Sequence, residues 1–202
     1  MTTVAEMPAG FANKVLSAQS TFRSVMDAMA RPGSVQRIAA PSGVPVSMMR
    51  GTAAIALTLF DQDTPVWLDG AMTAAPDVGK WIRFHCSAPV IGDAAICDFA
   101  VIGDPRLLQG FDRFALGSGE YPDRSTTLII QVDSLTQGAA IELSGPGIDG
   151  ATTLRASIGI PDLLDRLAVN HALFPRGVDL ILVADDAIVA IPRTTRLVAK
   201  EG

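Results

Sequence analysis

Two short runs that contain no polar residue, near the carboxyl end of the chain, constrain the fold more than any other stretch. They span Leu180–Ala184 and Ala187–Ile191, and only the pair Asp185-Asp186 separates them. Apolar runs joined by a two-residue polar turn predict a β-hairpin, here with strands from Asp179 to Ala184 and from Ala187 to Ile191. A strand with one face in water alternates apolar and polar residues, so these runs indicate that both faces are covered. The hairpin is therefore expected inside a sheet.

Length, composition and charge narrow the class of protein. A chain of 202 residues is most simply one α/β domain, which we expect to cover residues 1–202. Hydrophobic residues make up 49% of the chain and charged residues only 18%, so we expect that a partner covers some apolar surface. The net charge of −5 argues against binding to nucleic acid or to anionic membranes, because both need a basic face. An oligomer or complex subunit is the expected class.

The amino end and the cysteines indicate the compartment. Residues 1–9 include Glu6 and Pro8 and have no apolar core, so they do not resemble a secretory signal. No apolar run reaches the roughly 18 residues that span a membrane. Cys86 and Cys97 form no Cys-x-x-Cys pattern, and the chain has only two histidines, so buried, inert thiols are expected in place of a zinc site. We expect a cytoplasmic protein.

Residue patterns predict three helices. A 3.6-residue apolar repeat predicts an amphipathic helix over Phe11–Ala30, whose methionine-rich end faces either the core or a partner. Thr52 is expected to cap a second helix, Ala53–Phe60. Pro161 is expected to open a third, which runs to about Asn170.

The remaining patterns predict strands. Alternating apolar and polar residues predict a strand at Trp81–Cys86, after a surface loop over residues 69–79. A second hairpin is expected from Thr126–Val132 and Ala139–Ser144. Short strands are expected at Val35–Ile38, Val66–Leu68 and Cys97–Ile102. Hairpins mixed with helical segments indicate an α/β fold of three layers, in which helices cover both faces of a mixed sheet.

The loop that leads into the strand at Thr126 gathers polar chemistry. Between Gly117 and Ser125 it contains acidic residues, the only tyrosine, an arginine and a hydroxyl. Asp123 and Arg124 are therefore candidates for binding a ligand or a partner. A plain surface loop is the alternative.

Arginines frame the central hairpin. Arg176 precedes its first strand and Arg193 follows its second, and because hairpin strands run antiparallel, both guanidinium groups are expected at one edge of the sheet. Two like charges held close favour an anion or acidic partner between them, and Thr194 and Thr195 add hydroxyl donors. On this interpretation, alanine at either arginine abolishes complex assembly and shifts the melting temperature by only a few degrees. The alternative is that each arginine pairs with a local acid such as Asp179 and only caps the sheet.

Sequence motifs for catalysis are weak. His85 and Cys86 are neighbours on a predicted strand and so would point to opposite faces, and Ser125 lacks a Gly-x-Ser-x-Gly elbow. The run Gly145-Pro146-Gly147 lacks the third glycine of a dinucleotide loop and indicates a tight turn. Two pairs of aspartates could bind Mg²⁺, but paired acids in turns are usually solvated. We therefore predict no catalytic residues and no metal site.

Blocks of residues that follow one another over nearly the whole chain carry a family resemblance. They are Phe22–Gly33, Asp63–Leu68, Arg83–His85, Tyr121–Leu128, Gly145–Ile148, Phe174–Leu180 and Ile191–Thr195. As a set they resemble the PhnH family, the H subunit of the bacterial carbon–phosphorus lyase core complex. The resemblance implies a role in phosphonate breakdown, in which the subunits together transfer methylphosphonate onto the ribose of ATP with loss of adenine.

The resemblance also implies a fold and partners. The family's fold is similar to the large domain of pyridoxal-phosphate transferases without the cofactor, and the protein is expected to be a homodimer alone and a subunit beside the other core subunits. A pyridoxal enzyme needs a lysine for its Schiff base, and none of the three lysines, Lys14, Lys80 and Lys200, lies in a suitable strand-to-helix loop. No cofactor is therefore expected.

Two hypotheses about function stay open at this point. The first is an interaction subunit without activity of its own. The second is an independent enzyme that binds an anionic phosphate ester through Arg124, Arg176 and Arg193.

Overall fold

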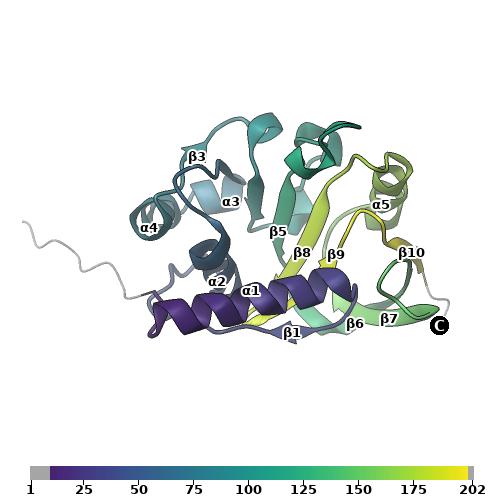
Figure 1. The fold of residues 1–202 in the computed structure, drawn as a ribbon, viewed down its shortest axis with the longest axis horizontal. Coiled ribbons are helices and arrows are strands. Elements are labelled where there is room, and N and C mark those ends of the chain that lie inside the picture. Colours follow the sequence, from purple (N-terminus) through teal and green to yellow (C-terminus); the bar gives the residue numbers. More distant parts are fainter. Residues whose placement is uncertain (1–9, 200–202) are drawn as a thin grey trace, which may run out of the picture.

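Two sheets organise the part of the chain that the computed structural model describes, residues 10–199. A seven-stranded sheet has the order β1-β9-β8-β5-β4-β2-β3, and a three-stranded antiparallel sheet has the order β10-β6-β7 (Figure 1). The strands of the large sheet are β1 (Gln36–Arg37), β2 (Val66–Leu68), β3 (Val90–Ile91), β4 (Phe99–Ile102), β5 (Thr127–Gln131), β8 (Asp179–Ala184) and β9 (Ala187–Ile191). Those of the small sheet are β6 (Ser134–Ser144), β7 (Ala151–Ser157) and β10 (Arg196–Ala199).

Helices connect most of these strands. The α-helices are α1 (Lys14–Ala30), α2 (Arg50–Leu59), α3 (Gly70–Thr73), α4 (Pro76–Cys86) and α5 (Leu163–Ala172). Short 3₁₀ turns are η1 (Ala94–Ile96), η2 (Pro105–Leu107), η3 (Phe111–Arg113) and η4 (Pro122–Arg124). Among the described helices none is long and apolar enough to cross a membrane.

The predicted central hairpin is confirmed residue for residue. β8 and β9 pair antiparallel, with Leu182 opposite Val189, and Asp185 in the turn between them has a φ of 51°. β8 also pairs in parallel with β5, while β1 covers the other edge of β9. Both strands therefore lie inside the sheet, which explains why their apolar runs contain no polar residue.

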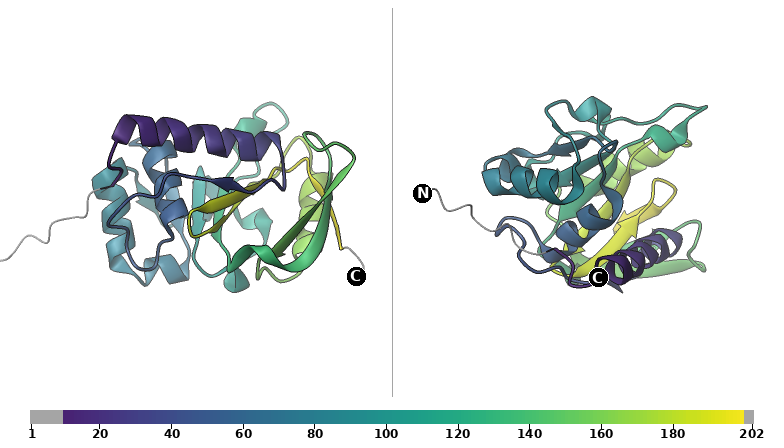
Figure 2. Two further views of the ribbon diagram at one scale, coloured as in Figure 1. Left: turned by 90° about the horizontal axis from the view of Figure 1, so that it is seen from below. Right: turned by 60° about the vertical axis from the view of Figure 1, so that its left-hand side comes forward.

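Different elements cover the two faces of the large sheet. Helices α1 to α4 pack against side chains such as Ile129 and Ile181 on one face. The small sheet, α5 and the 3₁₀ segments pack against the opposite face, on side chains such as Leu128 and Leu180. In both views of Figure 2 the purple helix α1 lies next to the yellow β8–β9 hairpin. The mixed α/β class is confirmed, but a second sheet covers much of the face for which only helices were predicted.

The segment predicted as a strand at Trp81–Cys86 is helical, so that prediction is wrong. It is the carboxyl half of α4, and the predicted loop over residues 69–79 contains α3 and the start of the same helix. Trp81, Ile82 and Cys86 are buried while Phe84 is 64% exposed, which is a helical pattern. The sequence alternates because Phe84, an apolar residue, lies on the exposed side of the helix between the buried residues Ile82 and Cys86.

Two further predictions are wrong. Thr52 does not cap α2, whose first residue is Arg50, but lies inside the helix and is fully buried. The strand β6 does not pair with β5, because β5 lies between β4 and β8 in the large sheet. β6 pairs instead with β7 and β10. β7, which the sequence did not reveal, supplies the partner that β6 needs.

Helix α1 is confirmed, but only part of its apolar repeat faces the core. Thr21, Val25 and Ala28 face the core. Val15, Phe22 and Met26, which belong to the apolar repeat in the sequence, are 65%, 49% and 52% exposed, and Leu16 beside them is 63% exposed. Much of the apolar stripe of α1 therefore lies on the molecular surface.

Candidate functional site

The carboxyl edge of the parallel strands is the usual ligand site of open α/β sheets. In this chain Asp69, directly after β2, occupies that edge. Its Oδ1 accepts the N–H of Met72 at 2.8 Å, and its Oδ2 accepts the N–H groups of Gly103 and Asp104 at 2.9 Å each. Asp69 is 8% exposed. The backbone donors between β2 and β4 are thus used by a carboxylate of the chain itself, which would repel an incoming anion.

Gln131, the last residue of β5, closes the neighbouring part of this edge. Its side-chain oxygen accepts the N–H of Met49 at 2.6 Å and the hydroxyl of Thr52 at 3.1 Å. Beyond it, Arg50 makes a hydrogen-bonded ion pair with Asp185 that holds the pKa of Asp185 below its usual value. The first turn of α2 is therefore engaged within the chain, and its N-terminus does not offer a free anion site.

Two adjoining hollows lie at the opposite, amino edge of the sheet. The first, which we call the Arg193 hollow, has a volume of about 410 Å³. Its lining residues are Met29, Pro122, Asp123, Phe174, Pro175, Asp179, Pro192, Arg193 and Thr194. It contains three of the predicted site residues and the ends of both strands of the central hairpin.

Arg193 has no N–H left for a ligand. Its Nε and Nη2 donate to the two carboxylate oxygens of Asp179, Nη2 also donates to Ser125, and Nη1 donates to the carbonyls of Pro122 at 3.0 Å and Pro175 at 3.2 Å. A guanidinium has five N–H donors, and these contacts use all five. The side chains of Arg193 and Asp179 are only 12% and 15% exposed. Arg193 therefore joins three segments of the chain. Its pairing with Asp179 is the alternative that the sequence left open for this arginine.

The other predicted site residues have different surroundings. Arg124 is exposed and lies over the ring of Tyr121, 4.4 Å from its centroid. Arg176 is exposed on the segment after α5, and within residues 10–199 its side chain takes part in no ion pair and no side-chain hydrogen bond. Thr195 is buried, and its hydroxyl has no hydrogen-bond partner in the described structure. The arginines therefore do not converge as three free cations.

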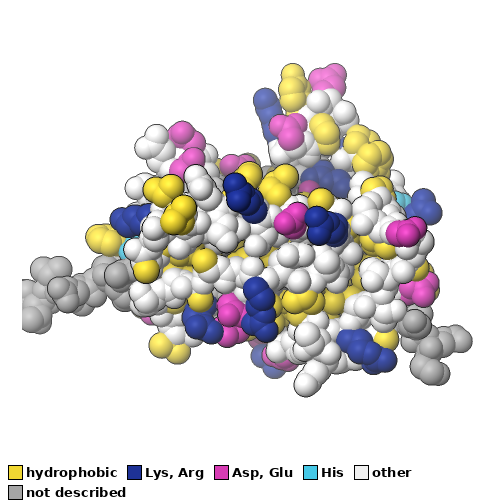
Figure 3. All heavy atoms as spheres, turned by 60° about the horizontal axis from the view of Figure 1, so that its bottom comes forward, with side chains coloured by type: hydrophobic (Ala, Val, Ile, Leu, Met, Phe, Trp, Pro, Cys, Tyr) yellow, Lys and Arg dark blue, Asp and Glu magenta, His cyan; other side chains and the backbone are white. Residues whose placement is uncertain are grey.

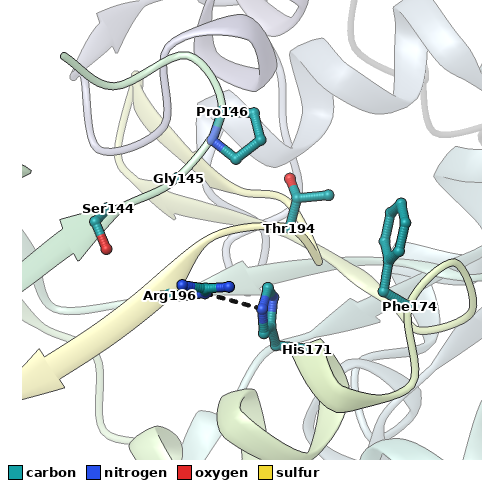
Figure 4. A pocket seen from close by; sticks show the side chains of 7 residues that line it. All are labelled: Ser144, Gly145, Pro146, His171, Phe174, Thr194 and Arg196. Carbon is teal, nitrogen blue, oxygen red and sulfur yellow. Dashed lines mark hydrogen bonds between the residues drawn. The ribbon is translucent and has the colours of Figure 1, made fainter. Parts of the chain in front are cut away.

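The second hollow, which we call the His171 hollow, adjoins the first. It has a volume of about 560 Å³ and is lined by Ser144, Gly145, Pro146, His171, Phe174, Thr194 and Arg196 (Figure 4). Three separate parts of the chain form it: the end of α5, the end of β6 and the start of β10. Sequence reasoning missed His171 and Ser144, because nothing in their local pattern shows that α5 and β6 meet at β10.

The cysteines and acidic residues give no sign of reactive chemistry. Cys86 and Cys97 are free and buried, and burial raises the pKa of Cys86 to about 12. The acidic turn of the central hairpin forms ion pairs, Asp185 with Arg50 and Asp186 with Arg37. Within residues 10–199 no three His, Cys, Asp or Glu side chains lie close enough together to hold a metal ion.

The two lysines within residues 10–199 line neither hollow. Lys14 opens α1 and Lys80 lies in α4, and both are exposed. Lys200 lies outside the described residues. So do residues 1–9, in which the sequence predicts no secretory signal.

The fold and the hollows together define a mixed α/β protein whose carboxyl edge is closed and whose open surface lies at the amino edge. The family model described as "Bacterial phosphonate metabolism protein (PhnH)" matches residues 9–198. The chain belongs to the PhnH family.

Two curated relatives agree with this assignment. The chain is 44% identical over 199 residues to the alpha-D-ribose 1-methylphosphonate 5-triphosphate synthase subunit PhnH of Rhizobium meliloti (strain 1021), with 98% of each chain covered. It is 30% identical over 199 residues to the putative C-P lyase subunit protein HtxG of Stutzerimonas stutzeri, with 97% of this chain and 95% of that protein covered. The resemblance found in the sequence is confirmed.

Proposed function

We propose that this chain is the PhnH subunit of a ribose 1-methylphosphonate 5-triphosphate synthase and acts in phosphonate catabolism, in the cytoplasm, beside the other subunits of a carbon–phosphorus lyase core complex. The observation that carries the proposal is the 44% identity, over 98% of both chains, to the Rhizobium meliloti synthase subunit. With its partners the subunit supports the transfer of methylphosphonate onto the ribose of ATP.

Within this complex the chain acts as an interaction subunit without turnover of its own. The closed carboxyl edge supports this role, because Asp69 and Gln131 occupy the positions from which an α/β enzyme usually holds its substrate. The closed edge also agrees with a fold that is similar to the large domain of pyridoxal-phosphate transferases but binds no cofactor. A cofactor phosphate at that edge would meet the carboxylate of Asp69.

An independent enzyme for an anionic phosphate ester is the less supported alternative. It requires Arg124, Arg176 and Arg193 to act together on one anion. Arg193 uses all its donors within the chain, and Arg124 lies over an aromatic ring. Arg124 and Arg176 would be left to bind the ester without the third cation.

We further propose that the isolated chain is a homodimer and that α1 forms the interface. Val15, Gln19, Phe22 and Met26 follow one another at intervals of four, three and four residues, which places them along one face of a helix. All four are exposed. In Figure 3, which turns the lower side of Figure 1 forward, hydrophobic side chains alternate with basic and acidic ones on this part of the surface.

The order of residues on this face is self-complementary. If two copies of α1 pack antiparallel about a twofold axis between residues 20 and 21, Val15 lies opposite Met26 of the second copy and Gln19 opposite Phe22. In the same register Lys14 faces Asp27, so opposite charges close both ends of the apolar contact. An isologous interface needs this self-complementarity.

Co-purification tests the proposed role. The chain, carrying an affinity tag, is expressed together with the other core subunits of the same organism and is purified through the tag. We expect the partners to be recovered in fixed proportion to the tagged chain. Recovery of the folded chain without any core subunit would contradict its role as a subunit.

A further inference from the structure

The His171 hollow contains a guanidinium whose orientation is fixed but whose terminal nitrogens are unused. Nε of Arg196 donates to Nε2 of His171 at 3.1 Å. Because an arginine only donates, Nε2 of the ring must accept, and the ring proton must lie on Nδ1. That nitrogen lies 3.2 Å from the carbonyl oxygen of Arg193, to which it donates. The neutral imidazole thus holds Arg196 by a single N–H.

The charge of Arg196 has no acidic partner in the hollow. None of the residues that line it is acidic, and Arg196 is in no ion pair recorded for residues 10–199. The carboxylate of Asp179, which lines the adjoining Arg193 hollow, is already bound by Arg193. Both Nη groups of Arg196 have no recorded hydrogen bond within the described chain and remain available to a ligand.

Both hydroxyl-bearing and apolar side chains line the hollow around Arg196. Figure 4 shows the guanidinium of Arg196 between Ser144 and His171, with Phe174 on the far side of the imidazole and Thr194 between His171 and Pro146. Ser144 and Thr194 contribute hydroxyls, while Phe174, 61% exposed, and Pro146 contribute apolar surface. A few polar groups set in an apolar wall are typical of a small-molecule site, and the volume falls within the usual range for one.

Backbone packing fixes the shape of this hollow. Gly145, at the end of β6, has a φ of 132°, and a Cβ there would lie 2.9 Å from the carbonyl oxygen of Thr194. Glycine therefore lets the turn after β6 pack directly against the segment that carries Thr194 and Arg196. The hydroxyls and the guanidinium are thus carried by backbone segments that pack directly against each other, which favours a preformed site.

We infer that the His171 hollow binds a small organic anion that carries a phosphonate or phosphate group. The anionic oxygens bind the two Nη groups of Arg196 and the hydroxyls of Thr194 and Ser144, and the organic part lies against Phe174 and Pro146. A guanidinium pairs with carboxylate and with phosphate groups, and the hydroxyls that line the same hollow offer donors for the further oxygens of a tetrahedral group. The site exists whatever the chain's role, and only the choice of probes rests on the proposed function.

Calorimetric titration of the purified chain tests this inference with four probes: inorganic phosphate, phenylphosphonate, ATP and acetate. We expect phosphate and phenylphosphonate to bind, and acetate to bind more weakly than either. Tighter binding of ATP than of phenylphosphonate would identify a nucleotide as the source of the anionic group, and tighter binding of phenylphosphonate would identify a phosphonate. Arg196→Gln should weaken phosphate binding by at least about tenfold, because it removes charge-assisted hydrogen bonds. Arg113→Gln makes the same change at an exposed arginine of η3, outside the hollow, and should leave binding unchanged.

A second variant tests the apolar part of the site independently of its anion-binding part. Phe174→Ala should weaken phenylphosphonate binding and leave inorganic phosphate binding unchanged, because only the organic part lies against Phe174. The inference is overturned if no phosphate or phosphonate probe binds, if acetate binds as tightly, or if Arg196→Gln binds like the unmodified chain. Any of these results can occur while the chain still co-purifies with its partners, so the failure of this site and the failure of the proposed function are distinguishable.

Discussion

At the scale of single residues, the central feature is that Arg193 is a structural connection. Its guanidinium joins the start of β8, through Asp179, to the carbonyls of Pro122 and Pro175. A partly buried charge pair contributes little net stability, but removing one partner leaves the other charge without compensation. Arg176, by contrast, is exposed, and its side chain is in no ion pair within residues 10–199, so its removal leaves no charge without compensation. The two arginines that the sequence treats as equivalent therefore have different roles.

Replacement of the two arginines should show this difference. Arg193→Ala should lower the free energy of unfolding by about 3 kcal/mol, because the Asp179 carboxylate stays partly buried without its cation. Arg176→Ala, the matched control, should change it by less than about 0.5 kcal/mol. Chemical denaturation measures both values. Equal effects of the two variants would show that the Arg193–Asp179 pair is not what holds these segments.

Burial of the thiols gives a second residue-scale prediction. Burial raises the pKa of Cys86 to about 12 and also raises the pKa of Cys97, and only the thiolate is nucleophilic. At pH 8 neither thiol should react with a thiol reagent in the native protein, while both should react in denaturant. Unfolded thiols ionise near pH 8.5, so stability should fall as the pH rises above that value. Rapid labelling of one native thiol would contradict this account.

At the scale of elements, close packing determines where α2 can lie. Gly51 in its first turn faces the hairpin turn, and a Cβ there would lie 2.7 Å from Cγ1 of Val183 and 2.8 Å from the carbonyl oxygen of Asp185. The backbone N–H of Gly51 also donates to that carbonyl at 2.6 Å. Only glycine permits this approach, which brings α2 against the central hairpin.

Alanine substitutions at two helical glycines should therefore have opposite effects. Gly51→Ala should lower the free energy of unfolding by about 1–3 kcal/mol, as overpacking does. Gly79→Ala in α4, where the nearest atoms to a Cβ lie 3.9 Å away, should raise it by about 0.5–1 kcal/mol. Thermal and chemical unfolding of both variants check the prediction. A neutral Gly51→Ala variant would show that α2 can shift away from the hairpin.

The exposed face of α1 gives the second element-scale prediction. Phe22→Asp should convert a homodimer into a folded monomer, because it places charges near the twofold axis of the proposed contact. Leu107→Asp is the matched control, since Leu107 is 74% exposed on η2 and lies outside α1. Light scattering at micromolar concentration measures the mass, and circular dichroism confirms the fold. An unmodified chain that is monomeric would refute the proposed interface.

At the scale of the whole molecule, the sequence correctly predicts those elements whose residues are all buried to a similar degree. The hairpin β8–β9 could be located from its residues alone, since both of its faces are buried and its turn is short. The strand β6 could not be paired correctly, because its partner in the sequence, β7, has a mixed burial pattern. For the same reason Ser144 and His171 could not be joined to Arg196. Contacts between distant segments depend on topology, which local patterns do not specify.

The central claim is that this chain contributes to a synthase only as part of a complex, and adenine release from ATP in the presence of methylphosphonate tests it most directly. We predict no release by the purified chain alone, release by the full set of core subunits, and loss of that activity when this chain is left out. Adenine release by the chain alone, or undiminished release without it, would contradict the account.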